Sequence, residues 1–186
     1  MRIISGNFKG KKILEPKDIY TRPLKDLTKE SIFNIISHSN KLKIKIEGSV
    51  ILDLFSGVGS FGIECLSRNV EKVFFVENYK KVLPILKINL SNLKLIDNFE
   101  IIEKNIYNGN IFESFNQIFD IIFLDPPYKD RNLEKVLIKI KNSKILKKKG
   151  ILILHRHKKE KENFSDEFKI IEEKIYGISK VFFITF

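Results

Sequence analysis

The stretch VILDLFSGVGSFGIECLSR, residues 50–68, decides the fold of this chain. It opens with a short apolar run that ends at Asp53, passes through closely spaced glycines, and continues with apolar residues at helical spacing. This order predicts a buried strand, a tight turn and a helix. Glycine lets the backbone turn sharply and approach a ligand closely, and the first N–H groups of a helix are left unpaired. A nucleotide-like ligand would suit such a turn.

The spacing Gly57-x-Gly59-x-x-Gly62 matches the dinucleotide-binding fingerprint, although a plain strand-to-helix turn has the same pattern. Two acids favour a ligand site. Asp53 stands at the end of its strand, where ligands bind in open α/β sheets. Glu77 ends the next apolar run, about 20 positions after Gly57, the distance at which an acid accepts hydrogen bonds from ribose hydroxyls.

Length and composition bound the class of protein. The 186 residues favour one domain, and the 43% hydrophobic content suffices for a sizeable core. No apolar run approaches the roughly 20 residues of a membrane span, and the N-terminus has no signal-peptide core. The single cysteine, Cys65, excludes an internal disulfide and fits a reducing compartment. We therefore expect a cytoplasmic protein with no membrane partner.

The net charge of +11, from 34 Lys and Arg against 23 Asp and Glu, favours a polyanionic partner. A compositional bias toward Lys, Ile and Asn is the alternative, so the positions of basic residues carry more weight than their total. A helix is expected over residues 24–36, with an apolar face made of Leu24, Leu27, Ile32, Ile35 and Ile36. Lys25 and Lys29 are expected on its opposite side, where they form a basic strip with Arg22.

Alternating apolar and helical segments predict an α/β fold. Strands are expected from residue 50 and at 72–76, 99–102, 119–124 and 151–154, helices at 60–67, 79–92 and 133–140, and a basic turn at 144–149. The runs 168–176 and 180–186 are too close for a crossover and predict an antiparallel pair. The result is a Rossmann-like, seven-stranded, mostly parallel sheet with a C-terminal antiparallel hairpin. A small N-terminal hairpin, residues 2–6 and 11–14, and the helix precede it.

Asp125-Pro126-Pro127-Tyr128 follows the apolar run 119–124. The prolines fix the backbone and remove N–H donors, the aspartate accepts hydrogen bonds, and a base can stack on the tyrosine for about 1–3 kcal/mol. A rigid turn is the alternative, but ligands gather at this edge of a sheet. The set suits methylation of an exocyclic amine on a nucleobase, because acceptors that hold the amine hydrogens aim the nitrogen lone pair at a methyl donor.

The architecture is similar to that of class I S-adenosylmethionine-dependent methyltransferases. The motifs together resemble the RsmD-type methyltransferases, which modify a guanine N2 in small-subunit ribosomal RNA. The similarity covers nearly the whole chain and includes RIISG at 2–6, FKG at 8–10, TRP at 21–23, ESIFNI at 30–35, LDLFSGVG at 52–59 and DPPY at 125–128. The last motif is shared with other amino-group methyltransferases, whereas the N-terminal segments are more particular to this family.

The resemblance implies S-adenosylmethionine as the cofactor. It assigns contacts with the methionine part of the cofactor to Asp53, Phe55, Ser56, Gly57 and Gly59. It assigns the ribose hydroxyls to Glu77 and the surroundings of the adenine to Asn78, Asn105 and Ile106. It assigns the target guanine to Asp125, Pro126, Pro127 and Tyr128. It assigns RNA contacts to Arg22, Lys25 and Lys29, within an extension at 1–40 that precedes a catalytic core at 49–186.

Two positions depart from the family pattern. Asn105 stands where the family usually has an acid, although an amide can still accept a hydrogen bond from adenine. The fifth strand usually ends in an acid, where this chain has His155, Arg156 and His157. Two histidines on one face of a strand could suggest a metal, but two ligands rarely suffice for zinc. We expect a basic surface end and no metal site.

The sequence therefore predicts a monomeric methyltransferase of guanine N2 acting on 16S ribosomal RNA or a small-subunit particle. An adenine-N6 methyltransferase on DNA or RNA is the first alternative, but it would need an added target-recognition region. A nicotinamide-dependent oxidoreductase shares the glycine turn and Glu77, but leaves the motif at 125–128 and the closing hairpin unexplained. A catalytically silent RNA-binding module is the last alternative, and the intact acceptors at 125–128 argue against it.

Overall fold

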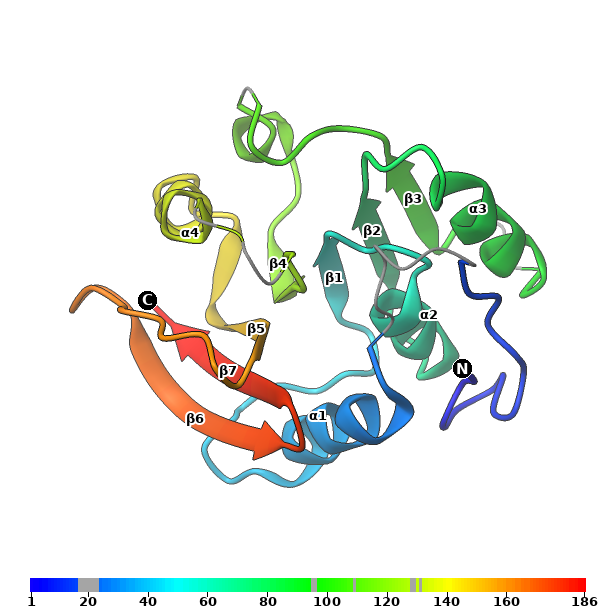
Figure 1. Ribbon diagram of the computed structural model, residues 1–186, viewed down its shortest axis with the longest axis horizontal. Helices are drawn as coiled ribbons and strands as arrows, with labels where there is room; N and C mark the ends of the chain where they lie inside the picture. Colours follow the sequence, from blue (N-terminus) through cyan, green and yellow to red (C-terminus); the bar gives the residue numbers. More distant parts are fainter. Residues whose placement is uncertain (17–23, 95–96, 109, 128–129, 131) are drawn as a thin grey trace.

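The computed structural model describes residues 1–16, 24–94, 97–108, 110–127, 130 and 132–186. Within these residues the chain forms a seven-stranded sheet of order β3-β2-β1-β4-β5-β7-β6 (Figure 1). The strands are β1 Val50–Leu54, β2 Lys72–Val76, β3 Phe99–Ile102, β4 Phe119–Leu124, β5 Leu146–His157, β6 Lys169–Tyr176 and β7 Ser179–Thr185. Strands β1 to β5 pair in parallel, and β7 pairs antiparallel with both β5 and β6. The predicted fold class is confirmed.

Helices cover both faces of this sheet. α1 (Asp26–His38), α2 (Ser60–Ser67) and α3 (Leu83–Ser91) lie on one face, and α4 (Leu133–Asn142) and the short 3-10 helix η1 (Phe112–Ser114) lie on the other (Figure 1). Side chains of a strand alternate between faces, so Ile51 packs with α1 to α3 and Leu52 packs with α4. In the described part of the chain, no helix has the length and apolar character needed to cross a membrane.

Two predicted boundaries differ from the structure. α3 starts at Leu83 rather than at residue 79, and Pro84 lies in its first turn, where a missing N–H costs no helical hydrogen bond. The predicted basic turn at 144–149 is wrong beyond its first residues, because β5 already begins at Leu146. The chain reverses at Lys144, whose φ is +54°. The first residues of β5 are lysine-rich and partly exposed, which hid the strand from the apolar pattern.

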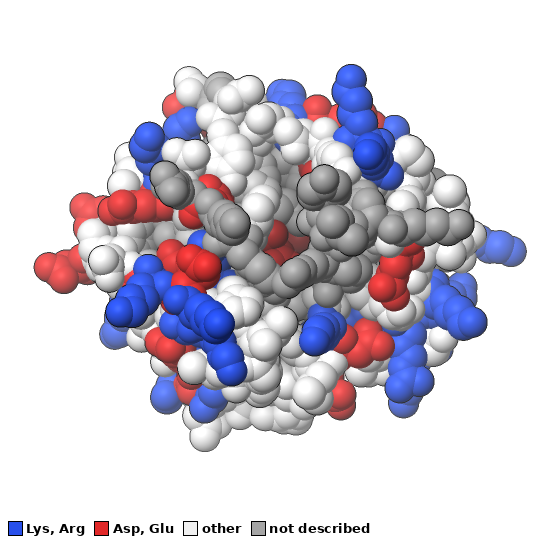
Figure 2. All heavy atoms as spheres, viewed as in Figure 1, with Lys and Arg blue, Asp and Glu red and all other residues white. Residues whose placement is uncertain are grey.

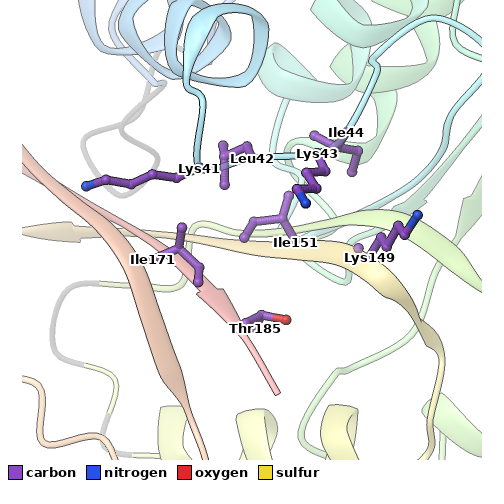
Figure 3. A pocket seen from close by; sticks show the side chains of 9 residues that line it. Lys41, Leu42, Lys43, Ile44, Lys149, Ile151, Ile171 and Thr185 are labelled. Carbon is purple, nitrogen blue, oxygen red and sulfur yellow. The ribbon is translucent and has the colours of Figure 1, made fainter.

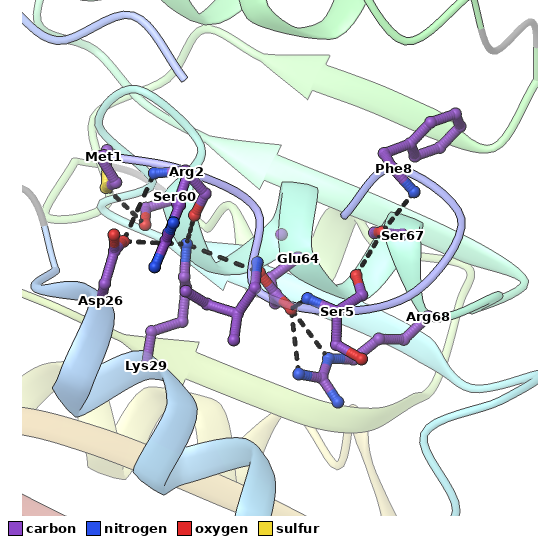
Figure 4. Close-up of polar contacts among 12 residues, drawn as sticks. Met1, Arg2, Ser5, Phe8, Asp26, Lys29, Ser60, Glu64, Ser67 and Arg68 are labelled. Atoms are coloured by element: carbon purple, nitrogen blue, oxygen red, sulfur yellow. Dashed lines mark hydrogen bonds and ion pairs between the residues drawn. The ribbon is translucent and has the colours of Figure 1, made fainter. Parts of the chain in front are cut away.

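The buried face of α1 also differs from the prediction. Leu27 is 69% exposed, whereas Lys29 is completely buried. The Lys29 ammonium donates to the carbonyl of Arg2 at 2.7 Å and lies 3.6 Å from the carboxylate of Glu64, which is also completely buried (Figure 4). The helix therefore turns a lysine inward, because a buried acid on α2 neutralises it, and leaves a leucine in solvent.

The N-terminal segment docks on α2 through the same acid. The predicted hairpin is reduced to one bridge between Arg2 and Lys12. The two carboxylate oxygens of Glu64 accept hydrogen bonds from the backbone N–H groups of Ile4 (2.7 Å) and Ser5 (2.9 Å). Figure 4 shows Glu64 lying between α1 and this segment. The extension is thus fixed against the helix that follows the glycine turn.

Candidate functional site

The ends of the parallel strands lie in register. Leu54 on β1 pairs with Val76 on β2 and with Leu124 on β4. One residue beyond this row, Glu77 and Asp125 leave their strands at the same edge of the sheet. The strand order reverses direction between β1 and β4, and in open α/β sheets ligands bind in the crevice at such a point. The space beyond the ends of β1 and β4, called the crevice below, is therefore the candidate site.

The glycine turn forms one wall of the crevice. Gly57 and Gly59 have positive φ angles of +54° and +86°, a backbone conformation that glycine adopts without strain. Phe55 also has a positive φ, +58°, which is uncommon for a residue with a side chain. Gly62 has a different role, because a Cβ there would lie 2.3 Å from the ring of Phe75. The first two glycines of the fingerprint shape the turn, and the third lets α2 approach the sheet.

Asp53 lies behind this turn and is buried. Its Oδ2 accepts a hydrogen bond from the Gly62 N–H at 2.9 Å, which pairs one of the N–H groups left open in the first turn of a helix. Burial raises the pKa of Asp53 well above its ordinary value, the Gly62 hydrogen bond lowers it, and the charges of Asp125 and Glu77 raise it again. The carboxyl groups of Glu77 and Asp125, which directly follow β2 and β4, thus belong to the same edge of the sheet as Asp53.

Glu77 connects the glycine turn to the segment after β2. Its Oε2 accepts a hydrogen bond from the Gly57 N–H at 2.7 Å, and its Oε1 accepts from the N–H groups of Asn78 and Tyr79, both at 2.8 Å. An ionised carboxylate offers about four acceptor positions. Three backbone bonds thus orient Glu77 and leave acceptor capacity for one further donor.

Ser56 carries a buried hydroxyl for which the described residues provide no hydrogen-bond partner. Its backbone N–H donates to the Val76 carbonyl at 3.2 Å, which places the residue between the ends of β1 and β2. Buried polar groups are normally hydrogen-bonded, and an unpaired one costs about 1–3 kcal/mol. A polar ligand in the crevice would satisfy this hydroxyl.

Residues after β3 lie beside the glycine turn. The Oδ1 of Asn105 accepts a hydrogen bond from the Tyr107 N–H at 2.9 Å, and Ile106 is buried. The Tyr107 ring lies 5.6 Å from the ring of Phe55, and its hydroxyl donates to the carboxylate of Asp130. Burial raises the pKa of Tyr107, and the hydrogen bond to Asp130 raises it further. Tyr107 is not among the predicted site residues. Its position two residues after Asn105 is the sequence feature that could have identified it.

The turn after β4 is held by the end of β5. The Oδ1 of Asp125 lies 2.7 Å from the Nδ1 of His155. Arg156 donates to the Pro127 carbonyl at 3.0 Å and pairs with Glu162. His155 is 4% exposed and Arg156 is 2% exposed. The prediction of a basic surface end is wrong for these two residues, because both side chains contact the turn and are covered by it and its neighbours.

The predicted RNA-contacting residues do not form one exposed strip. Lys25 is exposed just before α1, but the prediction that Lys29 contacts RNA is wrong, because its ammonium is enclosed between Glu64 and Arg2. Arg22 and Tyr128 lie outside the described residues. Figure 2 shows many Lys and Arg side chains around the margin of the face viewed, with acidic side chains both at its left margin and nearer its middle.

A separate groove lies at the opposite edge of the sheet. Its volume is about 160 Å³, and it lies between the loop at 41–44 and the starting half of β5, with Thr185 at the end of β7 (Figure 3). The side chains of Lys43 and Lys149 line it together with Ile151. Because Ile151 pairs with Ile121 near the start of β4, the groove is remote from the strand ends that carry Glu77 and Asp125.

Comparisons with known proteins match nearly the whole chain. The profile of a family described as "Conserved hypothetical protein 95" matches residues 1–185. YlbH of Bacillus subtilis is 32% identical over 183 residues, which are 97% of this chain and 96% of the relative. Ribosomal RNA small subunit methyltransferase D of Buchnera aphidicola is 32% identical over 173 residues, 93% of this chain and 86% of the relative. The solved structure of yhhF from Escherichia coli has a TM-score of 0.80 at 23% identity and covers 99% of this chain and 96% of its own, a likeness of fold.

Proposed function

Since the chain belongs to the family described as conserved hypothetical protein 95, which includes the RsmD-type ribosomal RNA methyltransferases, we propose that it methylates ribosomal RNA. The reaction is transfer of a methyl group from S-adenosylmethionine to the exocyclic N2 amine of one guanine in 16S ribosomal RNA, of the guanine 966 type. The substrate is the RNA or a small-subunit particle, and the enzyme acts as a cytoplasmic monomer.

The residues at the ends of β1 and β2 fit this cofactor. The buried Ser56 hydroxyl needs a polar partner, and the remaining acceptor capacity of Glu77 suits a ribose hydroxyl. Gly57 and Gly59 leave the turn without side chains, so a ligand can approach the backbone. When bound, S-adenosylmethionine supplies a methyl group on a positively charged sulfur, which is left as a neutral thioether after the transfer.

The acids of the crevice suit a cationic donor. Glu77 and Asp125 follow β2 and β4 at the same edge of the sheet, so two acids lie at this edge in a chain of net charge +11. Opposite charges attract strongly where water is scarce. Asp53 itself acts from behind the turn, by holding the start of α2 through Gly62.

Asp125 and the two prolines would hold the target amine. The Oδ1 of Asp125 faces His155, so we assign Oδ2 to an N–H of guanine N2, with the Pro126 carbonyl as the second acceptor. These acceptors aim the nitrogen lone pair, and the carboxylate stabilises the positive charge that develops on nitrogen. The nitrogen then loses one proton without a strong base, because attack makes the N–H acidic. The guanine must leave its stack to reach the crevice.

A single observation carries this proposal. Leu54, Val76 and Leu124 pair in one row, so the turn that fits the cofactor and the turn that fits the amine begin at the same edge of the sheet. A nicotinamide-dependent oxidoreductase would use the first turn and leave the second without a role. A reaction between a methyl donor and an amine gives a role to both turns.

The test uses small ribosomal subunits from cells that lack this gene, with the purified protein and methyl-labelled S-adenosylmethionine. We expect label in N2-methylguanosine by nucleoside mass spectrometry, and none with Asp125→Ala. Label in N6-methyladenosine would favour the adenine-N6 alternative instead. RNA binding without any methylated nucleoside would favour the silent RNA-binding module. Naked 16S ribosomal RNA in a parallel reaction separates the two forms of the substrate.

A further inference from the structure

Two neighbouring residues of β5 contact the two ends of the turn Asp125–Pro126–Pro127. His155 contacts the side chain of Asp125 at 2.7 Å, and Arg156 donates to the carbonyl of Pro127 at 3.0 Å. Neighbouring side chains of a strand point to opposite faces of the sheet. The turn is therefore held from both faces, and both its catalytic carboxylate and its backbone are constrained.

The strand geometry fixes these two side chains in turn. His155 and Arg156 lie in the regular antiparallel ladder between β5 and β7, opposite Val181 and Lys180. Arg156 is further held by its ion pair with Glu162, in the segment after β5. Such buried, paired side chains are costly to reorient, so they form a rigid support for the turn.

The contact with His155 also selects between the two oxygens of Asp125. With Oδ1 in contact with the imidazole, the carboxylate cannot turn freely without losing that contact, which leaves Oδ2 as the oxygen available to the target amine. The contact favours the charged imidazole, since burial lowers the pKa of His155 but the charge and hydrogen bond of Asp125 raise it above its ordinary value.

We propose that His155 and Arg156 are positioning residues for methyl transfer, with His155 orienting the Asp125 carboxylate and Arg156 fixing the backbone of the turn at Pro127. The inference rests on the proposed function, because it concerns how the amine acceptors are held. Neither residue touches the reacting atoms. Their loss should therefore change the turnover number and leave the affinities for cofactor and RNA nearly unchanged.

The central test compares substitutions at His155. His155→Asn keeps an amide N–H donor near the place of Nδ1, whereas His155→Gln moves the donor one bond further out. We expect His155→Ala and His155→Gln to lower kcat by up to about 100-fold, the cost of misplacing a catalytic group by about 1 Å. His155→Asn should recover most of the activity. KM for RNA and Kd for S-adenosylmethionine should stay within about twofold, because neither residue is placed in contact with the RNA or the cofactor.

The matched control is His157→Ala, two positions further along the same strand. His157 accepts a hydrogen bond from the Lys159 N–H, and its substitution should leave kcat unchanged. Arg156→Lys keeps the charge but lacks the planar fork that reaches Glu162 and Pro127 together, so kcat should fall with little change in KM. Thermal unfolding of each variant checks that the fold is retained.

The outcomes separate this inference from the proposed function. If the wild-type protein methylates no guanine, the proposed function fails. If it does, and His155→Ala has the wild-type kcat, the positioning role is overturned. Should His155→Ala not fold, the Asn and Gln variants decide: higher kcat for Asn supports the role, and equal kcat values overturn it. A rise in KM without a change in kcat also overturns it.

Discussion

The backbone N–H of Gly57 donates a hydrogen bond of 2.7 Å to the Oε2 of Glu77. This contact ties the glycine turn after β1 to the end of β2, and the other oxygen of Glu77 binds the backbone of Asn78 and Tyr79. One side chain thus shapes two segments of the proposed cofactor site. The acid about 20 positions after the first glycine of the fingerprint therefore holds the glycine turn itself, in addition to its proposed contact with a ribose.

Glu77→Ala should weaken the binding of S-adenosylmethionine by about 10- to 100-fold. Hydrogen bonds to a charged group contribute about 1.5–3 kcal/mol, and each 1.4 kcal/mol is about tenfold in Kd. Calorimetric titration measures the change. Glu103→Ala is the matched control, because Glu103 lies after the neighbouring strand β3 and is exposed. An unaltered Kd in Glu77→Ala would remove the ribose assignment.

Asp125→Ala should abolish methyl transfer while the protein stays folded and binds its cofactor. Removing one preorganised group that stabilises transition-state charge costs about 100- to 1,000-fold in kcat. Asp125→Asn keeps an acceptor oxygen and should retain more activity than Asp125→Ala. Asp166→Ala, an exposed aspartate after β5, should behave as wild type in the same assay. Normal turnover in purified Asp125→Ala would refute the role of the carboxylate.

The fold was predictable because its signals are local. Apolar runs such as 119–124 and the glycine turn announce buried parallel strands and their connections, and the short link between the last two runs requires an antiparallel pair. The same logic placed Glu77 and Asp125 together, since the ends of parallel strands share one edge. Local patterns failed at β5, whose lysine-rich start at 146–149 belongs to the strand, with Leu146 paired to Phe119 of β4 before the register shifts.

Contacts between distant residues were not predictable. Lys29 is buried because Glu64, 35 positions away, neutralises it, and nothing in the helical pattern of α1 identifies that partner. His155 and Asp125 are 30 positions apart and meet only because β4 and β5 are neighbours in register. A buried polar side chain is acceptable when it is paired, so polarity alone misassigned both Lys29 and His155 to the surface.

Lys29→Met should destabilise the fold and leave RNA binding unchanged. Removing one partner of a buried ion pair costs about 3–5 kcal/mol, because the other charge loses its compensation. Arg68, 3.0 Å from Glu64, should keep the loss near the lower end of that range. Chemical denaturation gives the free energy of unfolding. Lys41→Met is the control, since Lys41 forms an exposed ion pair with Glu172, and such pairs contribute about 0–1 kcal/mol.

Lys25→Ala should have the opposite pattern. Lys25 is exposed next to α1, so its loss should change stability by no more than about 0.5 kcal/mol. If it contacts an RNA phosphate, binding weakens for every RNA sequence, and the slope of log K against log salt falls by about 1. Binding titrations at several salt concentrations measure the slope. A slope equal to that of the wild type would make Lys25 ordinary surface.

The contribution of His155 to stability should depend on pH. Burial lowers the pKa of His155, but the charge and hydrogen bond of Asp125 raise it more, so the folded pKa lies above the ordinary value. A raised folded pKa means that the folded state holds the proton more tightly, so the stabilisation is complete below about pH 6.5 and is lost as the pH rises through the folded pKa. His155→Asn cannot bind this proton. The difference in unfolding free energy between wild type and His155→Asn should therefore be larger at about pH 6 than at about pH 9, and a difference that is constant across this range would show that the pair is not ionic.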